Sequence, residues 1–135
     1  MKETIENILL IDDDSATNFI HELLLKQLVH PKHIATVENG LKALEYLQTE
    51  EQGQYPQPDL ILLDINMPVM NGWEFLENYR NLDQNQRGTK LILMITATLS
   101  PAHMSKAEAN PLIDGFMKKP LNTAMVKELL QNHFG

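Results

Sequence analysis

The sequence predicts an α/β fold, in which a parallel β-sheet carries helices on both faces. Three observations lead to this expectation. Short apolar runs alternate five times with segments whose apolar residues recur at helical spacing. The chain has 135 residues, the size of one ordinary domain. It shows no internal repeat, low-complexity segment or linker. Strands that alternate with helices along a chain pair in parallel, because each helix returns the chain to the same edge of the sheet.

The five expected strands differ in how apolar they are. The first, third and fourth are continuous apolar runs, whereas the second and fifth are short or mixed. In chain order the strands are Asn7 to Ile11, His33 to Glu38, Leu60 to Leu63, Leu91 to Thr96 and Gly115 to Met117. Continuous apolar runs are typical of central strands that are covered on both faces. The ranking therefore fits the flavodoxin-like, doubly wound order 2-1-3-4-5, whose ligands bind at the carboxyl ends of the strands.

The first two helices are predicted from apolar residues that recur every three or four positions. Between the first two strands these residues are Phe19, Ile20, Leu23, Leu24 and Leu28. The second helix is expected to begin after Asn39, a favourable N-cap residue. Its apolar positions are Leu41, Leu44 and Leu47. A polar loop with two prolines, residues 49–58, then leads to the third strand.

The first residues of the next two helices mark where they begin. Asn71 and Glu74 stand three apart, as in a capping box, and Ser100 with Pro101 can cap and begin a helix that runs to about Ala109. That fourth helix is the least apolar of the five. The apolar positions of the third and fifth helices are Phe75, Leu76, Tyr79 and Leu82, and Met125, Val126, Leu129, Leu130 and Phe134.

Composition and charge narrow the function. The chain is 43% hydrophobic and 21% charged, as in a soluble globular protein, and its net charge of -7 with scattered lysines and arginines argues against nucleic acid as a partner. It has no cysteine for a disulfide or thiolate metal site, and no run long enough for a signal peptide or a membrane span. We therefore expect a cytoplasmic protein without a membrane partner. The histidines lack a metal-ligand pattern and are expected on the surface: His21, His30, His33, His103 and His133.

Charged and polar residues gather where the predicted strands end. They are Asp12, Asp13 and Asp14 after the first strand, Asp64 and Asn66 after the third, Thr96 after the fourth, and Lys118 and Lys119 after the fifth. The topology brings the acids of strands one and three side by side, where two carboxylates about 4 Å apart repel by roughly 4 kcal/mol. A Mg²⁺ ion would reverse that repulsion. The sequence thus predicts an acidic Mg²⁺ pocket with a hydroxyl and an ammonium nearby, which suits a phosphoryl group.

Four fragments carry a resemblance to a known family: "LLIDDDS", "LILLDINMPVMNG", "MITA" and "GFMKKP". In order and spacing, the chain resembles the receiver domain of two-component response regulators, of the stand-alone, chemotaxis-regulator-like type. The resemblance covers nearly the whole chain. It implies one receiver domain over residues 1–135 with no output domain, acting in phosphorelay signalling rather than as an enzyme on an external substrate.

The resemblance also implies roles for individual residues. Asp64 would accept a phosphoryl group from a sensor histidine kinase or a histidine phosphotransfer protein, and the domain would later remove it by autodephosphorylation. The resemblance implies further residues that bind the metal, residues that bind the phosphoryl oxygens, and residues of a switch that acts on an unknown downstream protein. Mg²⁺, or Mn²⁺, would be bound by Asp12 (through water), Asp13, Asp64 and the backbone carbonyl of Asn66; the phosphoryl group by Thr96, Ala97 and Lys119; and the switch residues would be Thr96 and Phe116. Lys118 and Lys119 should point to opposite faces, and the family spacing selects Lys119.

Other interpretations compete with this one. Taken alone, Asp64 would be a turn or cap residue, Asp14 a cap and Phe116 simple edge packing. A Mg²⁺-dependent aspartyl-phosphate phosphatase is the main alternative function, although such enzymes usually carry a second aspartate where this chain has Asn66. A flavin-binding module would need a Ser/Thr/Gly-rich loop in place of "DDDSAT", and an EF-hand loop lacks its closing glutamate. A receiver fold kept only for docking would not need its acids, threonine and lysine.

Overall fold

The predicted sheet is present in the computed structural model, which describes residues 5–95 and 100–134. Its strands within these residues are β1 (Asn7–Ile11), β2 (His33–Val37), β3 (Leu60–Asp64), β4 (Lys90–Ile95) and β5 (Gly115–Lys118). All neighbouring strands pair in parallel, in the order β2-β1-β3-β4-β5. The predicted strand order is therefore confirmed, with the less apolar β2 and β5 at the edges.

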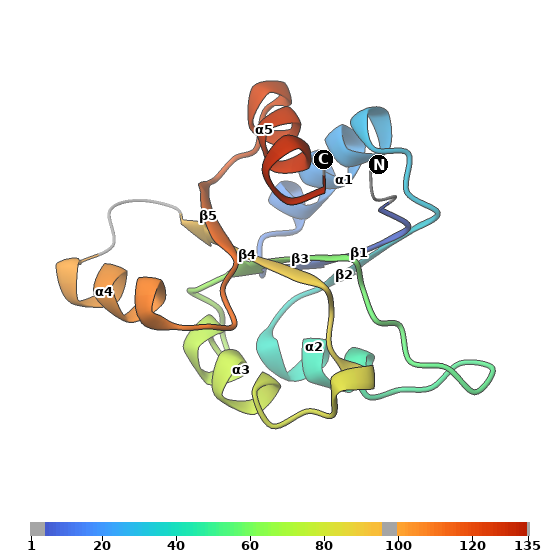
Figure 1. Ribbon diagram of the computed structural model, residues 1–135, viewed down its shortest axis with the longest axis vertical. Coiled ribbons are helices and arrows are strands. Elements are labelled where there is room, and N and C mark those ends of the chain that lie inside the picture. The colour runs from blue at the N-terminus through green and yellow to red at the C-terminus, as the bar shows by residue number, and fades with distance from the viewer. Residues whose placement is uncertain (1–4, 96–99, 135) are drawn as a thin grey trace.

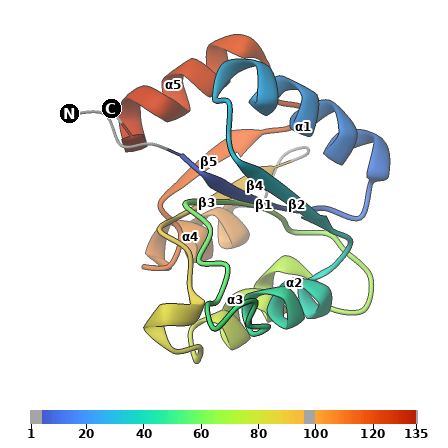
Figure 2. The ribbon, with the colours of Figure 1, turned by 90° about the vertical axis from the view of Figure 1, so that its right-hand side faces the viewer.

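Helices cover both faces of the sheet (Figure 1). In chain order they are α1 (Ser15–Leu28), α2 (Gly40–Leu47), α3 (Gly72–Tyr79), α4 (Pro101–Ala109) and α5 (Thr123–Phe134), with a short 3-10 helix at Gln84–Gln86 before β4. In both Figure 1 and Figure 2, α1 and α5 lie above the sheet, and α2, α3 and α4 lie below it.

The core has two layers because successive strand residues point to opposite faces of the sheet. Leu9, Ile61 and Leu93 face the α2 and α3 side, where they pack with residues such as Phe75 and Leu76. The other face of the sheet packs against α1 and α5 through Ile8, Leu10, Leu62, Met94, Leu25, Val126, Leu129 and Phe134. The three central strands are thus covered on both faces, as their apolar sequences predict.

The predicted helix starts are confirmed by their hydrogen bonds. The Asn39 side chain accepts from the backbone N–H of Lys42 at 2.9 Å, and the side chain of Ser100 accepts from that of His103 at 3.2 Å. Asn71 and Glu74 form the expected reciprocal capping box. Each side chain satisfies a backbone donor that has no partner inside the helix.

Helix α1 forms where expected, but its predicted apolar face is only partly buried: Leu24 and Leu28 pack against the core, and the other three predicted residues do not. Phe19, Ile20 and Leu23 are 60%, 51% and 51% exposed. The buried residues of α1 are instead Asn18, His21 and Leu25. The expectation that all histidines lie on the surface is therefore wrong for His21, which is 3% exposed. Asn18 and His21 each make a hydrogen bond to a backbone group outside the helix, which offsets part of the cost of burying them, although the Oδ1 of Asn18 has no hydrogen-bond partner among the described residues.

Helix α4 is only lightly attached to the rest of the domain. Of its described residues, Ala107 is the buried one. Helix α4 also contacts Trp73: the centre of the His103 ring lies 5.8 Å from that of the Trp73 ring, and the Lys106 Nζ lies 4.9 Å from the centre of the same ring. Trp73 belongs to the first turn of α3, so one indole links the two helices.

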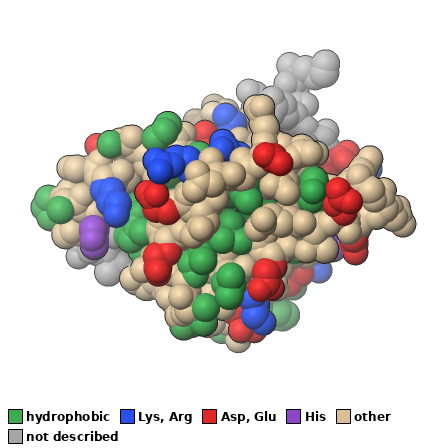
Figure 3. All heavy atoms as spheres, turned by 90° about the horizontal axis from the view of Figure 1, so that it is seen from below, with side chains coloured by type: hydrophobic (Ala, Val, Ile, Leu, Met, Phe, Trp, Pro, Cys, Tyr) green, Lys and Arg blue, Asp and Glu red, His purple; other side chains and the backbone are tan. Residues whose placement is uncertain are grey.

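The surface below the sheet, over α2 and α3, intersperses acidic, basic and hydrophobic side chains (Figure 3). The exposed large hydrophobic residues include Leu41 on α2 and Val69 in the loop before α3. In the part of the chain that the structure describes, none of the helices combines the length and apolarity needed to cross a membrane.

Candidate functional site

Three aspartates meet at the carboxyl ends of two central strands. Ile11 of β1 is paired with Leu63 of β3, so the residues that follow them, Asp12 and Asp64, become neighbours. Together with Asp13 they offer three carboxylate oxygens that all lie within 4.8 Å of one another. Asp12 and Asp64 are buried, and Asp13 is exposed. The acid cluster expected from the sequence is therefore brought together.

Lys119 is the cation of this cluster. Its Nζ lies 2.6 Å from Asp12 Oδ2 and 3.4 Å from Asp64 Oδ1. The neighbouring Lys118 is exposed at the end of β5. Successive residues point in opposite directions along a strand, so Lys119 alone of the two reaches the acids, as predicted. Asp14 is separate from the cluster, because its carboxylate caps α1 by accepting from Ala16 N at 3.0 Å.

The close packing of charges shifts the pKa values of the site. Burial raises the pKa of Asp64 from its ordinary value of 3.8 to about 6, the charge of Asp12 adds to the rise, and Lys119 opposes it. Burial alone would lower the pKa of Lys119, but its hydrogen bond to Asp12 and the two carboxylate charges more than offset that effect and raise it. At neutral pH Asp64 is therefore mainly ionised and Lys119 is charged. The positive charge of Lys119 only partly offsets the unfavourable effects of burial and of Asp12 on the Asp64 carboxylate.

The β3–α3 loop holds Asp64 through the backbone. The N–H of Gly72, the first residue of α3, donates to the carbonyl of Ile65 at 2.8 Å. A Cβ atom at Gly72 would lie 2.7 Å from the carbonyl oxygen of Asp64, so only glycine allows this approach. Asn66 is exposed in the same loop, two residues after Asp64. The first turn of α3 thus rests directly on the backbone of the buried acid.

The remaining predicted residues lie at different places. Phe116 is half-buried on β5 and packs against the core layer on the α2 and α3 side. The predicted Thr96 and Ala97 lie outside the described residues.

The donor set fits a hard divalent cation. Three carboxylates and one ammonium leave a net charge of about -2 in a small, partly buried space, which is unfavourable unless a cation joins them. Carboxylate oxygens are the ligands that Mg²⁺ takes in proteins, with water and phosphate oxygens completing its octahedron. Because Asp13 is exposed, the site is open on one side to water or to a ligand.

Two buried residues of α1 support this site and were missed by the sequence analysis. Asn18 Nδ2 donates to the backbone carbonyl of Asp12 at 2.9 Å, and His21 Nε2 accepts from the backbone N–H of Leu121 at 3.1 Å. Asn18, His21 and Leu25 are spaced by three and four residues, which places them on one helical face. That spacing is present in the sequence, but the more numerous apolar residues beside it indicated a different face.

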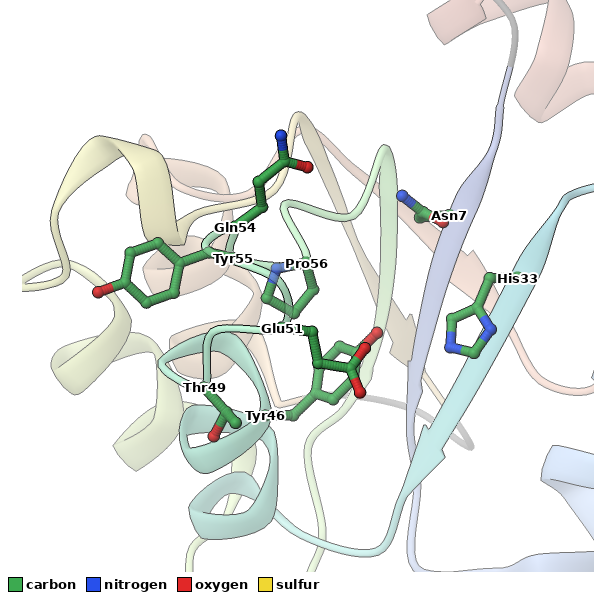
Figure 4. A pocket seen from close by; sticks show the side chains of 8 residues that line it. All are labelled: Asn7, His33, Tyr46, Thr49, Glu51, Gln54, Tyr55 and Pro56. Atoms are coloured by element: carbon green, nitrogen blue, oxygen red, sulfur yellow. The ribbon is translucent and has the colours of Figure 1, made fainter.

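A cavity in the described part of the chain lies away from the acid cluster (Figure 4). It holds about 450 Å³. Asn7 and His33, the first residues of β1 and β2, lie on one side of it, and Tyr46, Glu51 and Pro56 lie on the other. Since β1 and β2 are parallel, the cavity lies at the amino-terminal ends of the strands, and the acids lie at the carboxyl ends. It takes no part in the candidate site.

Comparison with known proteins finds matches to a receiver-domain family and to two-component signalling proteins. A family described as the response regulator receiver domain matches residues 8–131. Two-component response regulator ARR16 of Arabidopsis thaliana is 31% identical over 131 residues, which cover 91% of this chain and 77% of that protein. The sensor histidine kinase GacS of Pseudomonas protegens is 25% identical over 123 residues, and there the match spans 12% of the relative's length.

Solved structures share the fold. A two-component response regulator from Cytophaga hutchinsonii has a TM-score of 0.76 and 29% identity, and the match covers 96% of each chain. The receiver domain of a sensor histidine kinase from Pseudomonas aeruginosa PAO1 has a TM-score of 0.74 and 21% identity, covering 96% of this chain and 98% of the other. That structure holds a magnesium ion coordinated in its active site cleft.

Proposed function

The chain belongs to the response regulator receiver domain family, and from that premise we propose that it accepts a phosphoryl group on Asp64 in a phosphorelay. The observation that carries this proposal is the placement of Asp64. It is a buried carboxylate at the end of a central strand, it lies beside Asp12 and Asp13, and Lys119 Nζ is 3.4 Å away. A buried, poorly compensated acid beside other acids has no use in stability alone.

The proposed reaction is a phosphoryl transfer between two side chains. A carboxylate oxygen of Asp64 attacks the phosphorus of a phosphohistidine, the P–N bond breaks, and the leaving imidazole takes up a proton from solvent. The product on Asp64 is an acyl phosphate. Later attack by water on its phosphorus breaks the bond to Asp64 and releases inorganic phosphate, so the domain also removes its own signal. Lys119 holds its positive charge against the oxygens that gain negative charge.

Magnesium is the metal that the donor set supports. Asp13 and Asp64 would ligate Mg²⁺ by side chain, Asp12 through water and Asn66 by its backbone carbonyl, with Mn²⁺ as a substitute of similar preference. When bound, the ion neutralises charge that gathers on the phosphoryl oxygens during transfer. The magnesium ion held by the Pseudomonas aeruginosa receiver domain supports the same assignment here.

The proposed partners are proteins. A sensor histidine kinase or a histidine phosphotransfer protein would supply the phosphoryl group, and an unidentified protein would receive the output. We place the output surface on the face made by α4, β5 and α5 around Phe116, with Thr96 as the residue that responds to the phosphoryl group. Among the described residues of α4, Ala107 is the buried one, so a shift of α4 disturbs little of the core.

Mass spectrometry tests the covalent step. The protein is incubated with acetyl phosphate in the presence of Mg²⁺, and again with the metal chelated. We expect the wild-type protein to gain one phosphoryl group only when Mg²⁺ is present, and the Asp64→Asn variant to gain none. Asp14→Asn is the matched control, because Asp14 is an exposed N-cap residue and asparagine caps a helix equally well. Labelling of Asp64→Asn at the level of the wild type would overturn the assignment.

A further inference from the structure

The turn that carries Lys119 is fixed by two hydrogen bonds. Pro120 has no N–H, so the nearest backbone donors are those of Lys119 and Leu121. The N–H of Lys119 donates to the carbonyl of Ile95 on β4 at 2.9 Å. The N–H of Leu121 donates to Nε2 of His21 on α1 at 3.1 Å. The turn is therefore tied to the sheet by a backbone group on one side of the proline and to α1 by a side chain on the other.

His21 is suited to act only as an acceptor here. An imidazole nitrogen that accepts a hydrogen bond carries no proton, so Nε2 is unprotonated and a neutral ring has its proton on Nδ1. Burial lowers the pKa of His21, with the charge of Asp12 opposing the shift, so the ring stays neutral at physiological pH. Both His21 and Leu121 are buried, at 3% and 5% exposure, so water cannot easily replace either partner.

We propose that His21 is a positioning residue for the phosphoryl-binding lysine: by accepting the Leu121 N–H, it sets the place of the turn from which Lys119 reaches Asp12 and Asp64. This inference rests on the role proposed above for Lys119. Lys119 is only two residues from Leu121, and its Nζ lies 2.6 Å from Asp12 Oδ2 and 3.4 Å from Asp64 Oδ1. A displacement of the turn by about 1 Å would carry the ammonium out of productive geometry.

Asn18 lies on the same face of α1 and makes a second hydrogen bond to the site. Its Nδ2 holds the carbonyl of Asp12, one turn of helix before His21. One rigid helix thus holds both the backbone of an acid and the turn of the lysine that pairs with it. The separation of Asp12 and Lys119 is set through α1 rather than by the flexible lysine side chain alone.

Two amide substitutions separate this role from simple burial. His21→Gln places an amide oxygen near the position of Nε2, whereas His21→Asn is one methylene shorter and cannot reach Leu121. The probe is beryllofluoride, a mimic of the phosphoryl group, titrated in the presence of Mg²⁺ and followed by the amide NMR spectrum. We expect His21→Asn to bind beryllofluoride on the order of ten-fold more weakly than the wild type, and His21→Gln to recover most of that loss.

A double-mutant cycle with Lys119→Ala gives the decisive comparison. If His21 acts through Lys119, His21→Asn weakens beryllofluoride binding in the wild-type background and has no further effect once Lys119 is alanine. Equal losses in both backgrounds, or equal behaviour of the Asn and Gln variants, would overturn the inference. Should His21→Asn not fold, His21→Leu takes its place in the cycle, with folding checked by circular dichroism.

The same data distinguish failure of this inference from failure of the proposed function. If Lys119→Ala binds beryllofluoride as tightly as the wild type, the role of Lys119 itself is wrong. If Lys119→Ala weakens binding but His21→Asn does not, the proposed function stands and only the role of His21 is wrong. Lys118→Ala is the control for a nearby lysine, because Lys118 is exposed and outside the acid cluster.

Discussion

Helices α1 and α3 both support the acid cluster, but they do so by different means. Helix α3 buries Phe75, Leu76 and Tyr79, and its first residue, Gly72, touches the backbone of Asp64. Helix α1 buries Asn18 and His21 beside Leu25, and leaves large apolar residues exposed on its other side. Helix α3 is therefore held by apolar burial, whereas α1 also uses buried positions for hydrogen bonds.

The difference shows what a buried polar residue can contribute. Apolar burial supplies free energy but little direction, because it depends on area removed from water. A buried hydrogen bond adds little net stability but fixes two groups at a defined distance. Helix α1 makes such bonds to the backbone of Asp12 and to the turn that carries Lys119, the two segments whose separation we propose to matter for phosphoryl transfer.

The largest expected effect concerns the apolar side of this comparison. Phe75 is fully buried in the layer between α3 and the sheet. Phe75→Ala removes that contact and leaves a cavity, so we expect the free energy of unfolding to fall by about 3–5 kcal/mol. Urea unfolding measures it. A loss of less than about 1 kcal/mol would show that α3 is not held by apolar burial.

The next effect concerns Asp64, the last residue of β3, and the cost of its buried charge to the stability of the fold. The pKa of Asp64 is raised from 3.8 to about 6, so the folded protein binds the proton more tightly than the unfolded chain. The ionised carboxylate therefore destabilises the fold without metal, by up to about 3 kcal/mol at neutral pH. We expect Asp64→Asn to be more stable than the wild type in metal-free buffer, as measured by urea unfolding.

The sign of this effect with pH follows from the same shift. Below pH 3.8 the carboxyl group is protonated in both states, and the advantage of Asp64→Asn should vanish. It should grow as the pH rises toward 6 and stay constant above that. Added Mg²⁺ should stabilise the wild type and shrink the difference. An advantage that falls with rising pH would contradict the pKa shift of Asp64.

A smaller effect is expected on the polar side of α1. Asn18→Ala removes the hydrogen bond to the carbonyl of Asp12 and leaves that buried acceptor unpaired. We expect the free energy of unfolding to fall by about 1–2 kcal/mol. The backbone chemical shifts of Asp12 and Asp13 should change as well. If only the stability changes and these shifts do not, Asn18 fills space and does not position the acid.

The smallest effect is expected on the exposed side of the same helix. Leu23 is 51% exposed, so Leu23→Gln changes little buried surface. We expect a change within about 0.5 kcal/mol in the free energy of unfolding, by the same urea measurement. A loss comparable to that of Phe75→Ala would mean that the apolar face predicted from the sequence of α1 is buried after all.

The strand order could be predicted from the sequence because central parallel strands are continuous apolar runs, which are easy to recognise. Runs such as Leu60 to Leu63 are apolar on both faces only when helices cover both, and each is followed at once by its polar residue. Helix starts were predictable for the same reason, since Asn39 and Asn71 act on backbone donors only a few residues away. Local chemistry of this kind does not depend on the rest of the fold.

The contacts of Asn18 and His21 could not be predicted in this way. Their partners, Asp12 and Leu121, are fixed only once the sheet and α1 have packed, and the His21 bond spans 100 residues of chain. The apolar pattern of Phe19, Ile20 and Leu23 also pointed to the wrong face. The acids and Lys119 were found from the strand ends on which they stand, whereas the residues that hold them in place were not.

Helix α4 and Trp73 give the protein an optical property. Trp73 is the only tryptophan in the sequence, so intrinsic indole emission comes from one place. Its Nε1 is buried without a hydrogen-bond partner among the described residues, and its ring faces Lys106 and His103 of α4. An outward movement of α4 would take Lys106 and His103 away from the ring, so we expect the emission to change when α4 moves. Fluorescence of the unlabelled protein therefore reports on the position of a single helix, in real time.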